Sequence, residues 1–416
     1  MKICVAAICR NEEKNMEAWL NHVSKADGIC VVDTGSQDGT VQILGKFDHP
    51  NFHLMFDYAD ERNLGASRNL AATPFPDNAL IVWLDIDERF DDDNWVDALR
   101  AMPNIAQADS VSITMHNGNS TYYQKKAYRK KLYDWKYRAH EVLMSRNPDS
   151  HNRVTLTAPF ATNHYPDLDK ERNYLYELAL DVRDDPRDSR SSFYYARELC
   201  YRVIHGGTSD LYDDAVREVN RLTGFAEWKD YISLAHTELL RAAYVVQDMP
   251  QVIASGYMSI AQRPDRIESY GTFSDAFYRL GDNVSALSMA IQGIAAPNAE
   301  SLLFDTAQSN LDLCYDVAYL ACIELNLLTE ALHYLANRST LRGEDVNQSI
   351  ANSGLVERIN QSRSGAIPTE TSEVEVEGDS ESEASRPQAS DSKQEQHQGD
   401  SNEQQSPAET QDSSQA

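Results

Sequence analysis

The sequence predicts an α/β domain, in which a sheet is flanked by helices, followed by an all-α domain and a disordered acidic tail. Three observations support this prediction. In residues 1–166, short apolar runs alternate with polar loops and amphipathic segments, which is typical of β-α-β winding. Residues 167–362 contain one amphipathic helical segment after another. Residues 363–416 form a tail that, beyond Ile367, contains no aromatic residue, no Leu and no Ile, so it cannot bury a core.

The first 47 residues predict two successive strand-loop-helix units. The strands and helices are expected in turn at residues 3–9, 16–23, 29–32 and 41–47. Asp33 follows the second strand, where its carboxylate is placed to accept hydrogen bonds from a ribose or a base. Gly35 and Gly39 allow the next turn to come close to a ligand. A plain strand-to-helix turn with Asp38 as its N-cap explains the same residues without a ligand.

An acidic motif follows the next predicted strand. The segment from Leu80 to Phe90 reads LIVWLDIDERF, an apolar run that leads into Asp85, Asp87 and Glu88. Open α/β sheets bind ligands beyond the carboxyl ends of their strands. Carboxylate oxygens suit Mg²⁺ or Mn²⁺, which proteins commonly hold together with the phosphates of a substrate. The motif therefore indicates a metal site for a diphosphate-carrying ligand, although acids after a strand are also ordinary turn residues.

Four motifs in this order resemble the family 2 glycosyltransferases, whose nucleotide-sugar-binding fold is called GT-A. They are CRNEE at residues 9–13, VVDTGSQDGT at 31–40, NLGASRNLAA at 63–72 and WLDIDE at 83–88. The resemblance implies that residues 1–166 form a GT-A domain with a mixed sheet flanked by helices. It implies that Glu12 and Asp33 hold the nucleoside of the donor. It also implies that Asp85 and Asp87 carry Mn²⁺ or Mg²⁺ against the diphosphate, so that Asp85 binds both metal and donor.

The same resemblance assigns a cation and a third metal ligand. Arg68 lies at about the family's distance before the acids and would place a positive charge near the diphosphate or the sugar, with Arg62 as the alternative. His164 precedes Tyr165 in a segment that resembles the end of the catalytic domain in a subgroup fused to helical repeats. In that subgroup the histidine completes the metal shell. Pro166 replaces the subgroup's glycine here, and a structural, hydrogen-bonded histidine is the alternative.

The candidate base comes from a later segment. After a strand expected at residues 110–115, the chain reads RAHE at residues 138–141, which resembles the Arg-x-His-Glu segment of the same subgroup. An inverting transfer needs a base that takes the proton of the acceptor nucleophile, and Glu141 is the candidate. A purely structural pairing of His140 with Glu141 is the alternative. Other candidate bases are Asp91, Asp92 and Asp93, or an acid of the acceptor loop or of the repeat domain.

The segment from residue 167 to 362 predicts paired helices. Helices are expected at residues 192–204, 212–222, 231–246 and 250–262. In the most regular pair, large and small residues occupy the positions of a tetratricopeptide repeat: Tyr270, Phe273, Phe277, Gly281, Ala286 and Ala290. Because stacked helix pairs form concave surfaces, we expect this tetratricopeptide-like domain to bind an acceptor polypeptide, a glycan or a second subunit. A solenoid that only supports the catalytic domain is the alternative.

The charge of the chain argues against nucleic acids and anionic membranes as partners. The net charge is −27 over 416 residues. Residues 367–416 hold 13 acids and two bases, and their net charge of −11 leaves −16 on the first 366 residues. The body is therefore acidic as well as the tail, and acidic surfaces repel phosphate backbones and anionic lipids.

Cysteine usage and hydropathy predict a cytoplasmic protein. The six cysteines show no Cys-x-x-Cys spacing and lie mostly in apolar segments, so we expect buried free thiols in a reducing cytosol. The N-terminal strand carries a single lysine and continues into RNEE, which predicts neither a signal peptide nor a membrane anchor. The apolar runs are all much shorter than the ~20 residues that span a bilayer.

Together these features predict a metal-dependent, inverting glycosyltransferase of the hexosyltransferase type. Its donor would be a nucleotide-diphospho-sugar, with a UDP-sugar favoured, and its acceptor is undefined. The alternative is a non-catalytic adaptor that binds a sugar nucleotide and whose helical repeats bind a protein partner. A nucleotidyltransferase is disfavoured, because the Gly-rich phosphate-binding loop that such enzymes place after the first strand is replaced by residues 10–13, RNEE.

Overall fold

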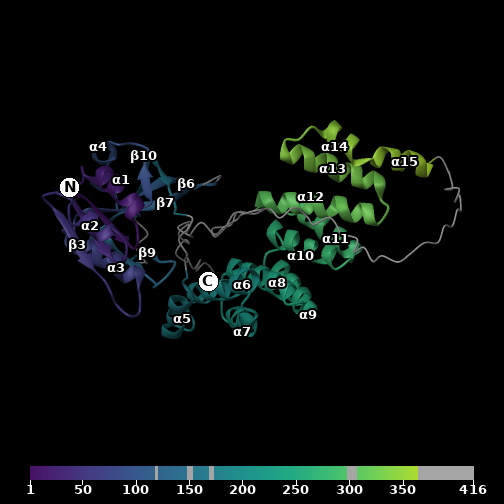
Figure 1. The fold of residues 1–416 in the computed structure, drawn as a ribbon, viewed down its shortest axis with the longest axis horizontal. Coiled ribbons are helices and arrows are strands. Elements are labelled where there is room, and N and C mark those ends of the chain that lie inside the picture. The colour runs from purple at the N-terminus through teal and green to yellow at the C-terminus, as the bar shows by residue number, and fades with distance from the viewer. Residues whose placement is uncertain (118–119, 148–152, 168–172, 298–306, 364–416) are drawn as a thin grey trace, which may run out of the picture. The chain divides into compact units, whose positions relative to one another are not determined.

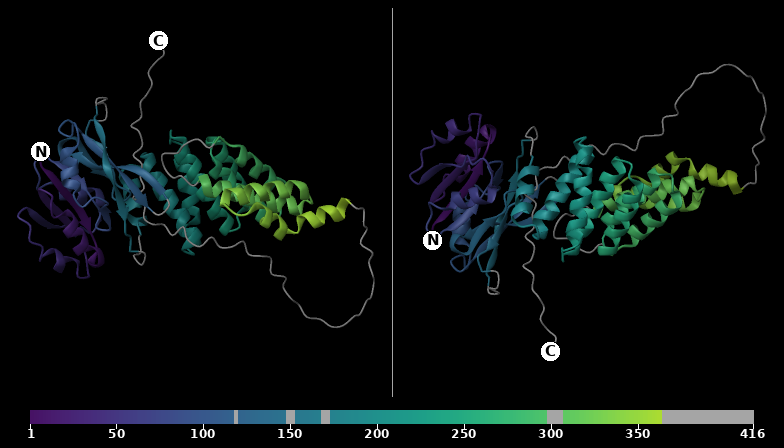
Figure 2. Two further views of the ribbon diagram at one scale, coloured as in Figure 1. Left: turned by 90° about the horizontal axis from the view of Figure 1, so that it is seen from above. Right: turned by 90° about the horizontal axis from the view of Figure 1, so that it is seen from below.

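The computed structural model describes residues 1–117, 120–147, 153–167, 173–297 and 307–363 (Figure 1). These residues form two compact units that divide between Tyr231 and Ile232. The first unit contains the sheet, and Figure 2 shows that the second, coloured teal to yellow, consists of helices. The predicted acidic tail lies outside the described residues from position 364 onward.

Within the described residues, eight strands of the first unit form one sheet in the order β3-β2-β1-β4-β7-β6-β10-β5. The strands are β1 (Ile3–Cys9), β2 (Gly28–Asp33), β3 (Phe52–Phe56), β4 (Leu80–Trp83), β5 (Glu88–Phe90), β6 (Ser110–Asn117), β7 (Ser120–Arg129) and β10 (Thr155–His164). Strands β3, β2, β1 and β4 run parallel, whereas β7 runs antiparallel to both β4 and β6. The sheet is therefore mixed, as predicted. A separate antiparallel pair joins β8 (Tyr133–Lys136) to β9 (Val142–Ser145).

Helices cover both faces of the sheet. They are α1 (Glu13–Val23), α2 (Thr40–Leu44), α3 (Leu64–Ala72) and α4 (Trp95–Ala101). Successive side chains of β1 point to opposite faces, so Val5 packs in one apolar cluster with Trp19 of α1, and Ala6 packs in another with Ala71 of α3. Burial on both faces explains why the parallel strands are continuous apolar runs. Helix α2 ends before the predicted Phe47, because Gly45 follows and glycine is a poor helix former.

Three further helices belong to the first unit: α5 (Leu175–Asp184), α6 (Ser189–His205) and α7 (Tyr212–Thr223). Strand β10 ends at His164 and α5 begins at Leu175, so the last strand precedes residue 166 and the first of these helices follows it. Ion pairs attach α5 to the sheet domain, since Arg62 contacts Glu177 at 2.6 Å and Arg138 contacts Asp181 at 2.9 Å. These contacts place α5 in the same compact unit as the sheet.

The second unit is helical throughout its described residues. Its helices are α8 (Lys229–Val245), which begins just before the division, α9 (Met249–Gln262), α10 (Ile267–Arg279), α11 (Asn283–Ala295), α12 (Ala307–Glu324), α13 (Leu328–Arg342), α14 (Val346–Ser353) and α15 (Leu355–Arg363). The large residue Phe273 is fully buried, and Gly256 of α9 leaves room for its ring. Ala286 and Ala290 are also buried, which fits close packing of α11. The predicted fold class, a mixed α/β sheet domain followed by an all-helical region, is confirmed.

All six cysteines are free and buried, as predicted. Among the helices of the described residues, none is both long enough and apolar enough to cross a membrane.

Candidate active site

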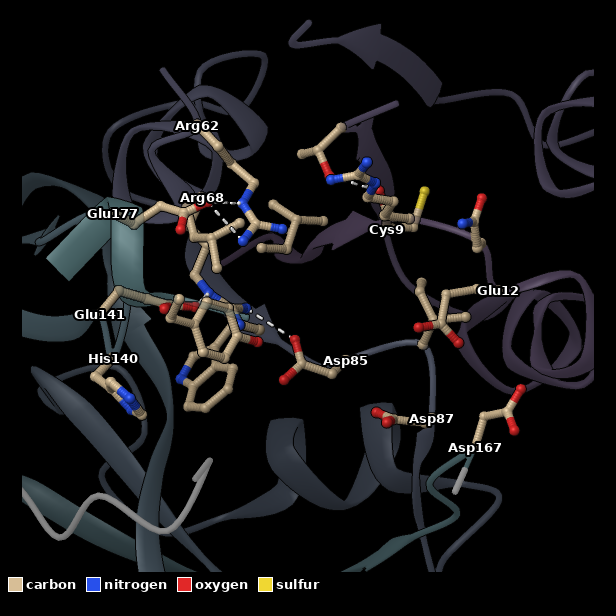
Figure 3. Close-up of a pocket in the computed structure, with 18 of the residues that line it drawn as sticks. Cys9, Glu12, Arg62, Arg68, Asp85, Asp87, His140, Glu141, Asp167 and Glu177 are labelled. Atoms are coloured by element: carbon tan, nitrogen blue, oxygen red, sulfur yellow. Dashed lines mark hydrogen bonds and ion pairs between the residues drawn. The ribbon is translucent and has the colours of Figure 1, made fainter. Parts of the chain in front are cut away.

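A cavity of about 1000 Å³ lies in the first unit, at the carboxyl ends of β1 and β4. Figure 3 shows Glu12 on one side of this cavity and Glu141 and Glu177 on the other. Asp85 lies between the two sides. This is the edge at which open α/β sheets bind ligands, so the fold itself marks the cavity as the candidate site. Its wall also includes residues of α5.

Asp33 holds a turn next to the cavity. Its side chain is fully buried, and Oδ1 accepts hydrogen bonds from the backbone N–H groups of Gly35 and Ser36, both over 3.1 Å. Gly35 has a φ of +106°, a conformation that side chains with a Cβ rarely adopt. Thr34, rather than Asp33, lines the cavity. The carboxylate thus shapes the loop that borders the predicted nucleoside side.

Glu12 lines the cavity from the loop after β1. Its backbone N–H donates to Oγ1 of Thr40 over 2.7 Å, which joins this loop to the start of α2. A second link runs from the backbone N–H of Gln37 to the side chain of Asn11 over 2.7 Å. The first two polar loops of the sequence therefore form one connected rim.

Arg68 of α3 connects two of the predicted site residues. Its Nη1 donates to Asp85 over 2.9 Å, and its Nε donates to Glu141 over 2.6 Å. The guanidinium also lies 5.0 Å from the ring centres of both Trp83 and Trp135. Burial alone would lower the pKa of Arg68, but the two carboxylates outweigh it and raise the pKa above its ordinary value. Arg68 is therefore a fixed cation at the centre of the site.

The positive charge of Arg68 in turn affects the pKa of Asp85. Burial by itself would raise the pKa of Asp85, but the charges of Arg68 and Lys126 outweigh burial and lower it to about 2. Asp85 is therefore ionised at neutral pH, as a metal ligand requires.

A close backbone contact places Arg68 beside the Arg-x-His-Glu segment. At the start of α3, Gly65 donates its N–H to the carbonyl of Tyr137 over 3.1 Å. A Cβ at Gly65 would lie 2.5 Å from that carbonyl oxygen, so only glycine fits there. Tyr137 and His140 adopt positive φ values of 78° and 50°. Such conformations are costly for residues with a Cβ and occur where surrounding structure fixes them. The glycine of the motif NLGASRN thus has a packing role.

Asp87 pairs with His164, which stands at the end of β10. The distance from Nε2 of His164 to Oδ2 of Asp87 is 3.1 Å, and both residues line the cavity. Burial alone would lower the pKa of His164, but the hydrogen bond and charge of Asp87 raise it above its ordinary value. The three predicted metal ligands, Asp85 included, therefore share one cavity.

The donor set fits a divalent cation that is bound together with a diphosphate. The described residues contain no preformed cluster of three or more His, Cys, Asp or Glu side chains that could hold a metal by themselves. Arg68 and His164 each engage one oxygen of a carboxylate. Mg²⁺ and Mn²⁺ commonly take only one or two carboxylates from the protein and complete their shells with substrate phosphates and water. Asp85 and Asp87 supply ligands of that kind.

The alternatives named from the sequence have other partners or lie outside the cavity. Arg62 lines the cavity but pairs with Glu177 of α5. His140 stacks on Tyr194 of α6, with ring centres 4.3 Å apart, while Glu141 pairs with Arg68. The three other acids considered as bases follow the acidic motif and do not line the cavity: Asp91, Asp92 and Asp93.

The sequence did not predict a buried ion pair that lies behind the acidic motif. Lys126 of β7 is fully buried and donates to both carboxylate oxygens of Glu88 over 2.7 Å. Glu88 in turn accepts the backbone N–H of Asp85 over 2.9 Å. Burial raises the pKa of Glu88 and lowers that of Lys126, and the charge of each residue partly offsets the effect of burial on the other. Lys126 lies where the register of β7 against β6 shifts, between Lys125 and Ala127, so strand alternation did not mark it as buried.

Comparison with protein families decides the class of this domain. The family model for glycosyl transferase family 2 matches residues 4–163. These residues form a family 2 glycosyltransferase domain. The matched range holds the acidic motif and nearly the whole sheet, and it ends before α5. The predicted family and enzyme class are confirmed.

Solved structures give only distant similarities. The structure of MamA is 14% identical, with 41% of this chain and 86% of that chain covered at a TM-score of 0.33. S. aureus TarS 1-349 is 15% identical, with coverages of 71% and 91% and a TM-score of 0.33. Its complex with UDP is 14% identical, with coverages of 71% and 89% and a TM-score of 0.26. These similarities are too low to support a functional argument. No curated protein matches the chain.

Proposed function

We propose that the protein is a metal-dependent, inverting glycosyltransferase that moves a hexose from a nucleotide-diphospho-sugar to an acceptor hydroxyl or amide. The observation that carries this proposal is the placement of Asp85, Asp87 and Glu141 around one cavity of a family 2 domain. A UDP-sugar is the favoured donor. The intact acidic motif favours an enzyme over the adaptor alternative.

In this proposal, Glu12 and the loop shaped by Asp33 bind the nucleoside. Asp85 and Asp87 would hold Mn²⁺ or Mg²⁺, which supplies positive charge to the departing diphosphate when bound. Arg68 adds a fixed positive charge beside Asp85 and orients its carboxylate.

The position of Glu141 supports its role as the base. An inverting displacement needs the acceptor nucleophile and the leaving diphosphate on opposite faces of the sugar. Figure 3 shows Glu141 across the cavity from Glu12, with Asp85 between them. Glu141 therefore lies on the side from which an acceptor would approach, and its carboxylate would take the proton of the nucleophile.

The test measures release of free nucleoside diphosphate from a panel of nucleotide sugars. We expect one donor class to be hydrolysed slowly by the wild type, with activity lost in EDTA and restored by Mn²⁺ or Mg²⁺. Asp87→Ala should abolish release and leave the fold intact. Asp97→Ala is the matched control, because Asp97 is an exposed acid of α4 that does not line the cavity.

Two outcomes would contradict the proposal. Full activity in excess EDTA would exclude the metal. Tight donor binding by the wild type without hydrolysis or transfer would favour the adaptor instead.

A further inference from the structure

Part of the cavity wall comes from a helix outside the family 2 domain. Asn173, Tyr174, Tyr176 and Glu177, at and before the first turn of α5, line the cavity. The family match ends at residue 163, so this wall lies outside the matched range. Glu177 lies on the same side of the cavity as Glu141 and opposite Glu12 (Figure 3).

The wall is held in place by ion pairs and hydrogen bonds. Nη2 of Arg62 lies 2.6 Å from Glu177 and donates to the carbonyl of Asn173 over 3.2 Å. Further along α5, Arg138 contacts Asp181 at 2.9 Å and Asp184 at 2.7 Å. Both arginines belong to the sheet domain and pair with acids of α5. A wall with several such ties is preorganised, which lowers the entropic cost of binding a ligand against it.

The charges of the wall favour a neutral ligand. The two arginines that line the cavity beside it are neutralised, since Arg62 pairs with Glu177 and Arg68 pairs with Glu141. A site for a phosphate or another anionic acceptor would instead present cations without matching carboxylates. Carboxylate and amide oxygens, which this wall does present, accept hydrogen bonds from hydroxyl groups.

An exposed aromatic ring completes this chemistry. Tyr176 lines the cavity and is 58% exposed. An exposed aromatic face offers a flat apolar surface with a polar rim, and the C–H groups of a sugar ring can pack on it while its hydroxyls reach polar neighbours. The neighbouring carboxylate belongs to Glu177.

We propose that the α5 wall is the acceptor subsite and that it binds a sugar ring stacked on Tyr176, so that the acceptor is a neutral carbohydrate. This proposal rests on the proposed glycosyltransferase function. It adds the class of acceptor, and it assigns acceptor choice to a helix outside the range that the family model matches. Glu141 then stands next to the acceptor hydroxyl that it would deprotonate.

The experiment compares donor hydrolysis with transfer in the full chain. The donor is the nucleotide sugar that the hydrolysis panel selects, and the acceptors are p-nitrophenyl hexosides and peptides that contain Ser, Thr and Asn. Tyr176→Ala should lower kcat/KM for the hexoside about tenfold or more, mainly through a higher acceptor KM. Donor hydrolysis without acceptor should stay within about twofold of the wild type.

Two variants sharpen the comparison. Tyr176→Phe keeps the ring and should retain most of the transfer activity. Tyr123→Ala is the matched control, because Tyr123 of β7 is 63% exposed and does not line the cavity. It should leave acceptor kinetics unchanged.

The proposal is overturned if Tyr176→Ala leaves hexoside kinetics unchanged while donor hydrolysis is normal. Transfer to peptides but not to hexosides would also overturn it and would point to a polypeptide acceptor. In both cases donor hydrolysis persists and the proposed function stands. If the wild type hydrolyses no donor, the proposed function itself is contradicted, and the acceptor subsite is contradicted with it.

Discussion

The Nε atom of Arg68 donates a hydrogen bond to Oε1 of Glu141 over 2.6 Å, between residues 73 positions apart in the chain. The same guanidinium holds Asp85. One buried cation therefore links the proposed base to the proposed metal ligand and sets the distance between them. Because Trp83 and Trp135 flank the guanidinium, it has little freedom to move.

Substitution of the base should separate donor binding from catalysis. Glu141→Gln keeps the shape of the side chain but removes its ability to accept the proton. We expect donor affinity to change little and transfer to fall by ~10² to 10⁴, which is the usual contribution of general-base catalysis. Calorimetry with UDP and single-turnover transfer, performed on both proteins, provide the two quantities. If affinity collapses together with rate, Glu141 belongs to the donor-binding shell instead.

The buried pair behind the acidic motif should be sensitive to the loss of one partner. Lys126→Met leaves Glu88 buried and without its cation, so we expect the sheet unit to lose about 3–5 kcal/mol of stability. The double variant Lys126→Met, Glu88→Gln should recover a large part of this loss, because no uncompensated charge remains. Urea unfolding followed by tryptophan fluorescence measures both.

Lys125→Met is the control for this pair, because Lys125 is adjacent in β7 and only half-buried. A loss as large as that of Lys126→Met would show that the strand, rather than the ion pair, is the sensitive feature.

The helical unit should lose stability in mild acid. Burial lowers the pKa of His236 of α8 from its ordinary value of 6.5 to about 4. Between these values the unfolded chain binds a proton that the folded unit does not. Stability should therefore fall as the pH drops from about 6.5 towards 4, by roughly 3 kcal/mol for this group alone. Thermal melts across that range should show a shallower decline for His236→Gln, and an equal decline would contradict this assignment.

The tail should be dispensable for stability and donor turnover. Its composition lacks the apolar residues required for a core, so we expect deletion after Ile367 to leave the melting temperature and the rate of donor hydrolysis nearly unchanged. Differential scanning calorimetry and the nucleotide-release assay measure these two properties. A large drop in either would show that the tail docks on the body.

The sequence by itself determined several elements and their order. Strand β1 matches its predicted range, Ile3–Cys9, and helices α6 to α9 begin and end within a few residues of their predicted ranges. The strand follows from a short apolar run and the helices follow from helical periodicity, and neighbouring residues encode both. The acidic motif at the end of β4 also follows locally, since a buried strand delivers the next residues to the edge of the sheet.

Only the tertiary structure decided which charges meet. Lys126 pairs with Glu88 across 38 positions, and Arg62 pairs with Glu177 across 115. Such pairs depend on strand order and register and on where α5 packs, and these are set by burial over the whole unit rather than by local pattern. The role of the Asp33 side chain likewise depends on the folded loop. Its carboxylate accepts hydrogen bonds from the N–H groups of Gly35 and Ser36 and so stabilises the turn that follows β2.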